Sequence, residues 1–109
     1  MLDKLTSANF APHLHEIFQL SLEPSDPAYD PAAHGALAIE LVEVEALGAE
    51  PAADSPKRRP FSLVFREPAG TYLPQRIYSI EHPTLGRLDL FLVPIGPDQG
   101  GMLYQAVFT

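Results

Sequence analysis

Four short segments in the second half of the chain alternate apolar and polar residues, and proline- and glycine-rich stretches separate each from the next. Alternation with a period of two predicts β-strands with one buried face, and the separators predict tight turns. The connections are too short and too little helical in pattern for parallel crossovers, so the sheet should be antiparallel. The segments are FSLVFRE (61–67), QRIYSIEH (75–82), GRLDLFLVPI (86–95) and MLYQAVFT (102–109).

The first half of the chain adds two predicted strands. HLHEIFQLSL (13–22) alternates over its second half, and LAIELVEVEAL (37–47) is rich in β-branched residues. The apolar residues of the second segment shift from one alternation to the other near Leu41, which predicts a β-bulge there. The bulge would keep four side chains inward: Ile39, Leu41, Val42 and Val44.

A helical turn is predicted before the first strand. LTSANFA (5–11) offers Thr6 or Ser7 as the N-cap of a single turn. Two proline-rich loops, 23–36 and 48–60, lack periodicity and are expected to vary in conformation. The turn would place Leu2, Leu5 and Phe10 against the body of the protein.

Six strands in 109 residues predict one all-β domain, residues 1–109, folded as an antiparallel meander that forms a small barrel or sandwich. The absence of cysteine excludes disulfides, thiol catalysis and cysteine-based metal sites. The longest apolar-rich stretch, 88–96, is far shorter than the ~20 residues that span a bilayer, and no signal peptide is expected. These features predict a soluble, cytoplasmic protein with no membrane partner.

Charge divides unevenly along the chain. The net charge is -7; residues 1–54 hold 10 acidic residues against one lysine, whereas residues 55–109 hold four acidic against six basic residues. Cross-strand pairing explains this best, with Glu40, Glu43 or Glu45 opposite Arg66 or Arg76; an acidic partner-binding face is the alternative.

Lys57, Arg58 and Arg59 form the one basic cluster in the sequence. Nucleic-acid binding would require a basic domain and interleaved aromatic residues, and only Phe61 is nearby, so no nucleic-acid partner is expected. The cluster is interpreted as a solvated loop tip, with docking of an acidic protein partner as the alternative.

Histidines give a weak metal-binding pattern. His13 and His15 would share one face of a strand, Glu16 follows, and His34 or His82 would be needed as a third ligand. Because His-x-His without a second spaced ligand pair is common in proteins that bind no metal, no metal site and no cofactor are predicted.

Catalytic machinery is also not indicated. Glu81 and His82 are adjacent on a strand and should point to opposite faces, so His82 is interpreted as stabilising a turn. Ser62 and Ser79 lie within strands and outside any Gly-x-Ser-x-Gly frame. GPDQGG (96–101) lacks the lysine and the helix of a phosphate-binding loop and predicts a hairpin turn. We therefore expect no enzyme and no catalytic residues.

Alternation identifies a candidate binding face on the segment 86–95. If Leu88, Leu90 and Leu92 face the core, Phe91 and Val93 face outward. In an open sheet that second face would form an apolar patch for another chain, whereas a sandwich would cover it. Phe91 and Val93 are therefore predicted partner-binding residues, together with the basic cluster.

Five stretches cover most of the chain outside the two proline-rich loops: LTSANF (5–10), PFSLVFR (60–66), LPQRIYSIEHPTLG (73–86), LFLVPIGPD (90–98) and YQAVF (104–108). On these stretches the chain resembles a family of small uncharacterised bacterial domains. The resemblance includes a loose association with phage-tail-collar-like fibre proteins of the Microcystis-dependent type, which implies an accessory or assembly role and carries no catalytic residues.

Taken together, the sequence predicts a non-enzymatic accessory or assembly protein that binds another protein, such as a fibre or tail-like subunit, through edge strands or an apolar sheet face. The first alternative is a small β-barrel that binds a small molecule at its mouth. The second is an enzyme that uses His82 with Glu81 or Arg76. The sequence is also compatible with a homo-oligomer.

Overall fold

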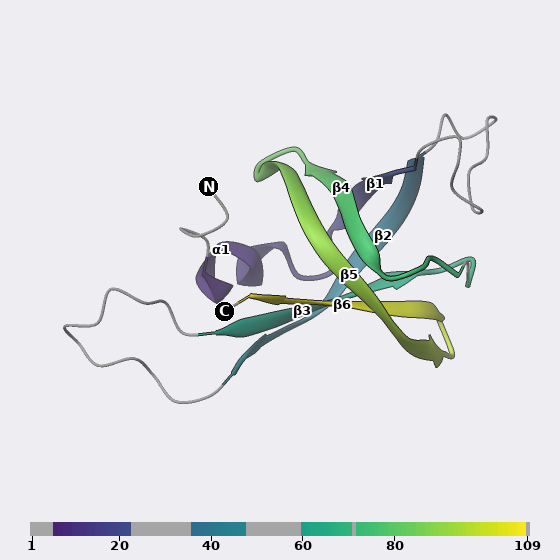
Figure 1. Ribbon diagram of the computed structural model, residues 1–109. Helices are drawn as coiled ribbons and strands as arrows, with labels where there is room; N and C mark the ends of the chain where they lie inside the picture. Colours follow the sequence, from purple (N-terminus) through teal and green to yellow (C-terminus); the bar gives the residue numbers. More distant parts are fainter. Residues whose placement is uncertain (1–5, 23–35, 48–59, 71, 109) are drawn as a thin grey trace.

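The computed structural model describes residues 6–22, 36–47, 60–70 and 72–108. Within them, six antiparallel strands close into a barrel, preceded by a short helix and a 3₁₀ turn (Figure 1). The all-β prediction is confirmed, with the barrel rather than the sandwich. The elements are α1 (Ser7–Phe10), η2 (Ala11–His13), β1 (Ile17–Ser21), β2 (Ala36–Ala46), β3 (Phe61–Glu67), β4 (Arg76–His82), β5 (Gly86–Asp98) and β6 (Gly101–Phe108).

The strand order around the barrel is β1-β2-β3-β6-β5-β4, which departs from a simple meander at one connection. β3 pairs with β6 along its whole length instead of with β4, and β4 closes the barrel against β1. A simple meander would leave β1 and β6 as unpaired edges unless they met each other. The observed order gives every described strand two neighbours.

Inward-facing aromatic side chains fill the barrel. Phe18, Phe65, Tyr78 and Tyr104 are almost fully buried. Tyr78 donates a hydrogen bond to the carbonyl oxygen of Pro74 (2.6 Å), and the Tyr104 hydroxyl accepts one from the amide of Leu73 (2.8 Å). Burial raises the pKa of Tyr104 to about 12. The two tyrosines thus fasten the β3–β4 connection to the core.

α1 covers one end of the barrel with a single aromatic side chain. Phe10 is fully buried, and its ring lies 5.8 Å from that of Phe61 and 5.7 Å from that of Phe108. The Asn9 side chain accepts a hydrogen bond from the Thr6 amide (2.7 Å), so Thr6 is the N-cap, one of the two predicted. Leu2 and Leu5, which were also expected to pack here, lie outside the described residues.

The predicted bulge in β2 is confirmed between Leu41 and Glu43. It keeps Leu41 buried and places Val44 against the core, as expected. Val42 was expected inward as well, but it is the bulged residue and lines a hollow on the outside of the barrel. Only one of the two residues at a bulge can follow the inward alternation.

Arg66 on β3 lies opposite Glu40 on β2, as one of the predicted cross-strand pairs requires. Its closest ion pair, however, is with Asp98 at the end of β5, where Arg66 Nη2 lies 2.6 Å from Asp98 Oδ2. Asp98 also accepts a hydrogen bond from the amide of Gly100 (2.8 Å), so it closes the β5–β6 turn. The hairpin predicted from GPDQGG is confirmed.

Every described strand has two neighbours in the closed barrel, but some stretches pair on one side alone: β2 pairs with β1 only at Ala36–Glu40, and β5 pairs with β6 only from Val93 onward. The last part of β5 extends past its pairing with β4, which ends at Leu92. That part carries Pro94 and Pro97 and a bulge, and proline cannot donate the backbone hydrogen bonds of a new ladder. Binding through an edge strand stays a prediction. Among the described helices, none is long and apolar enough to cross a membrane.

Candidate functional site

His13, Glu16 and His82 meet at the seam between the N-terminal segment and β4; we call them the histidine–glutamate cluster. His82 Nε2 lies 2.7 Å and His13 Nδ1 lies 2.8 Å from the same Glu16 oxygen, Oε1. His82 is 6% exposed, and its ring contacts those of His13 and Phe18, with centroid distances of 4.6 Å in each case. The potential ligand atoms of the three residues all lie within 4.8 Å of one another.

His13 and His15 do not share a strand face, because the first strand starts only at Ile17. His13 ends η2, and His15 adopts a positive φ of 70° in the following turn. The His15 ring therefore turns to Glu40 on β2, with Nδ1 2.9 Å from Oε2. The His-x-His pair predicted from spacing is wrong for this reason. His34, the other possible ligand, lies outside the described residues.

The hydrogen bonds of His82 determine what the cluster can do chemically. The backbone amides of Thr84 (3.1 Å) and Leu85 (3.3 Å) donate to Nδ1, so the proton of the neutral ring lies on Nε2 and is donated to Glu16. A metal-bound histidine normally donates its second N–H to an acceptor, the opposite arrangement. The cluster therefore does not fit a metal ion. His82 caps the turn after β4, as predicted.

The histidine–glutamate cluster changes the pKa of Glu16. Hydrogen bonds from His13, then from His82, hold the pKa of the Glu16 carboxyl below its ordinary value of 4.5. The backbone joins the same region to β2, through His15 N to Leu41 O (2.6 Å) and Leu41 N to Glu16 O (3.1 Å). The cluster therefore attaches the N-terminal segment to β2 and β4.

A second candidate site lies on the outside of β4, β5 and β6. Ile77 is 65% exposed and lies directly opposite Phe91, which is 47% exposed. Val93 follows on the same face of β5 opposite Gln105, and Val107 lies two residues beyond Gln105 on β6, 54% exposed. We call Ile77, Phe91, Val93 and Val107 the apolar strip. The outward positions predicted for Phe91 and Val93 are those observed.

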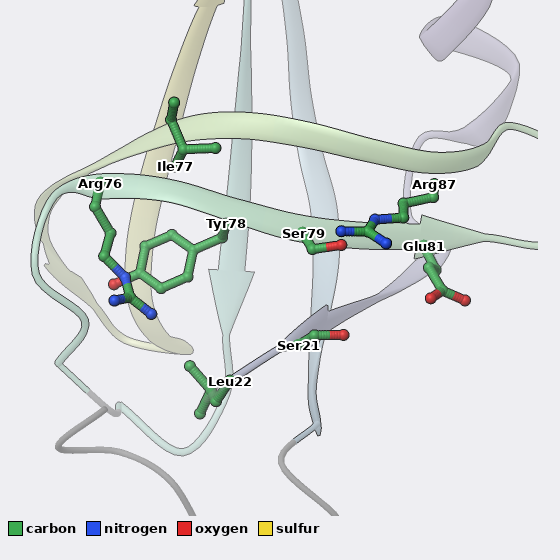
Figure 2. A pocket seen from close by; sticks show the side chains of 8 residues that line it. All are labelled: Ser21, Leu22, Arg76, Ile77, Tyr78, Ser79, Glu81 and Arg87. Carbon is green, nitrogen blue, oxygen red and sulfur yellow. The ribbon is translucent and has the colours of Figure 1, made fainter. Parts of the chain in front are cut away.

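A polar hollow of about 240 Å³ adjoins the strip at Ile77 (Figure 2). Ser21 and Ser79, which are opposite each other in β1 and β4, line it. The Arg76 guanidinium lies over the ring of Tyr78, with 4.7 Å from Cζ to the ring centroid. The hollow is open and mostly polar, whereas the strip is apolar, so they offer different surfaces. Its remaining lining residues are Leu22, Glu81 and Arg87.

The sequence analysis missed two members of the apolar strip, Ile77 and Val107, and the contact between Glu16 and His82. Ile77 alternates with the buried Tyr78, so the same rule that placed Phe91 outward identifies it. The contact of Glu16 with His82 had no local signal, because 66 residues separate them. Among the predicted binding residues, Lys57, Arg58 and Arg59 lie outside the described residues.

The fold and the outer surface together define a small closed β-barrel with a side-chain-filled interior and an apolar strip on its wall. The chain belongs to the family DUF6916, a domain of unknown function whose family model matches residues 5–108. Comparison with curated proteins and with solved structures found no match. The resemblance to an uncharacterised family is thereby confirmed, and its association with tail-collar fibre proteins gains no support.

Proposed function

We propose that this domain is a non-enzymatic protein-binding domain whose partner covers the apolar strip. The observation that carries the proposal is the exposure of Ile77 and Phe91 at directly opposed positions of β4 and β5. Burying apolar surface contributes about 25 cal/mol per Å², and central aromatic residues often dominate the binding energy of protein interfaces. A partner that covers the pair would gain that free energy without a change in the barrel.

The interior of the barrel argues against a small molecule as the main ligand. An eight-stranded barrel is just wide enough for side chains to fill its centre, and this barrel has six strands around buried Phe65, Tyr78 and Tyr104. Recognition on the outer wall needs no internal space. The strip therefore supports the protein partner over the ligand-binding barrel.

The geometry of His82 argues against catalysis. A general base needs a nitrogen lone pair that can reach substrate. Nδ1 of His82 already accepts two backbone hydrogen bonds, and Nε2 donates to Glu16. Glu81 lies on the exposed face of β4, away from the buried imidazole. His82 is thus better suited to hold the turn than to move a proton.

An accessory or assembly role agrees with a domain that binds through its outer wall. The closed order of the strands and the exposed apolar side chains favour the sheet face over an edge strand as the contact surface. The comparisons do not support a fibre or tail-like subunit, so the proposal commits to a protein partner of unspecified identity.

The experiment is a pull-down with the tagged full chain from its source cells, followed by native mass spectrometry of the eluate. Phe91→Ser should lower the recovery of a stoichiometric partner at least tenfold, about the effect of losing an aromatic anchor. Ile17→Ser is the matched control, since Ile17 on β1 is 48% exposed and outside the strip.

Equal recovery with the parent chain and Phe91→Ser would place the binding elsewhere and contradict the proposal. A bare chain that carries a small molecule would support the ligand-binding alternative. Circular dichroism and thermal unfolding of both variants should match the parent chain, because each change lies on the outside of a strand.

A further inference from the structure

The turn of residues 83–85 connects β4 to β5, and one imidazole ring holds it closed. Nδ1 of His82 accepts hydrogen bonds from the backbone amides of Thr84 (3.1 Å) and Leu85 (3.3 Å). We propose that this turn is a pH-sensitive switch, closed by the neutral His82 ring and opened when the ring takes up a second proton. The inference goes beyond the proposed function and does not depend on the apolar strip.

His82 can bind a second proton only at Nδ1, because Nε2 already carries the proton that it donates to Glu16 Oε1 (2.7 Å). A protonated imidazole has an N–H at both nitrogens and accepts no hydrogen bond at either. The new N–H at Nδ1 would point at the N–H groups of Thr84 and Leu85, which would lose their acceptor. Protonation of His82 and closure of the turn are therefore incompatible.

The packing of the ring determines which part gives way. His82 is buried, and its ring contacts those of His13 and Phe18. A rotation of the ring away from the turn would break these contacts and the hydrogen bond to Glu16. Thr84 is exposed, so its amide can exchange the imidazole for water at little cost. The turn should therefore move while the ring stays in place.

Two titratable groups among the described residues face the His82 ring, and both come from the N-terminal segment: Glu16 and His13. The neighbouring strands contribute Phe18 from β1 and Gly86 from β5, which have no charge. The pKa of the Glu16 carboxyl is held below 4.5, so Glu16 stays ionised where imidazole titrates, between about pH 5 and 8. The Glu16 carboxylate attracts a proton to the ring, and a charge on His13 would oppose it.

The opening would be confined to the hairpin end. Leu85 is partly buried and packs against the core, so it would lose that contact. The pairing of β4 with β5 continues from Ile80 opposite Leu88 to Arg76 opposite Leu92, away from the turn. The barrel would stay closed, and the ion pair of protonated His82 with Glu16 would still attach the N-terminal segment to β4.

The test is an NMR titration of the ¹⁵N-labelled full chain from about pH 7.5 to about pH 5. As the pH falls, Nδ1 of His82 should gain a proton, and the amide resonances of Thr84 and Leu85 should shift with the same midpoint. Exchange of these two amides with water should become about tenfold faster than the change in pH alone explains. The amide of Leu90 within β5 should show no such change.

Two variants assign the response to His82. In His82→Asn the side-chain oxygen takes the position of Nδ1 and accepts from the same amides, but it does not titrate, so the turn amides should lose their midpoint. His15→Asn is the matched control, because His15 is exposed and bonded to Glu40, and it should keep the response of the parent chain.

Several results would overturn the inference. The ring of His82 could gain its second proton while the amides of Thr84 and Leu85 stay unchanged, or it could remain neutral down to about pH 5. His82→Asn could keep the midpoint of the parent chain, which would assign the response to another group. Loss of the Leu90 amide at the same midpoint would indicate unfolding of the barrel in place of a local opening. None of these results bears on the partner of the apolar strip.

Discussion

Backbone conformation and individual hydrogen bonds determine the roles of His13, His15 and His82. Spacing alone suggested that His13 and His15 act as a pair, but one ends a 3₁₀ turn and the other has a positive φ. His82, which alternation marks as an inward residue at a strand end, acquires its partner from a distant part of the chain. Two backbone amides on Nδ1 are enough to separate a structural imidazole from a metal ligand.

Glu16→Gln tests the cluster through the pH dependence of stability. The pKa of Glu16 is lowered in the folded protein, so its contribution is fully present above the unfolded value near 4.5 and is lost as pH falls through the lower folded value. The parent chain should be more stable than Glu16→Gln at pH 7, and the difference should shrink below about pH 4.5. Urea unfolding over a pH series measures it.

Glu81→Gln serves as the control for that series, because Glu81 is exposed on the outer face of β4. Its unfolding free energy should stay within about 0.5 kcal/mol of the parent chain at neutral pH. A difference between Glu16→Gln and the parent that stays constant through acid pH would show that the cluster does not act through the Glu16 carboxylate.

At the scale of elements, β5 joins two parts of the barrel, because it pairs with both β4 and β6. Its first seven residues pair with β4, and from Val93 onward it pairs with β6, with a bulge between Pro94 and Gly96. The β5–β6 hairpin then returns against β3, where Arg66 holds Asp98. One long strand therefore connects the two parts of the sheet.

Gly101→Ala should be one of the most destabilising changes in this hairpin. Gly101 has a φ of 142°, and a Cβ there would overlap the carbonyl oxygen of Glu67 and lie 2.8 Å from Cα of Pro68. Because the obstacle is backbone, the expected loss of unfolding free energy is about 2 kcal/mol or more. Thermal or denaturant unfolding measures it.

Gly70→Ala separates the overlap from the backbone conformation. Gly70 has a φ of 75°, but no atom lies within 4 Å of the Cβ that alanine would add. Only the left-handed conformation is penalised there, at about 1 kcal/mol. Equal losses for the two variants would mean that the contact with Glu67 has no effect on stability.

The strands could be predicted from the sequence because their signals are local. Alternation gave β3 its observed bounds and the bulge of β2 its position near Leu41. Closure of the barrel is not local: β3 pairs with β6 and β4 pairs with β1, and no short segment of the sequence encodes that choice. The apolar strip was partly predictable through Phe91, whereas the contact of Glu16 with His82 depends on the closed fold.

At the scale of the whole molecule, the net charge and the apolar strip have opposite effects on self-association. The net charge of -7 disfavours contact between copies of the chain at neutral pH, although exposed charges are screened beyond about 8 Å at physiological salt. The apolar strip would otherwise favour self-association. The balance between them changes with pH.

Light scattering over a pH series tests this balance. The chain should be monomeric at pH 7 and should associate near its isoelectric point of about 4.8, where the net charge vanishes. Phe91→Ser should reduce the association at that pH, because it removes the aromatic residue of the strip. Identical scattering by the parent chain and the variant would assign the association to another surface.

The position of Phe10 has a topological consequence. Its ring lies 5.7 Å from that of Phe108, so α1 and the last residue of β6 are neighbours in space (Figure 1). Joining these extremities by a short linker and opening the chain between β2 and β3 would give a circular permutant with the same set of strand pairings. The strand pairings of this barrel form a closed cycle, and several chain orders are compatible with the same core.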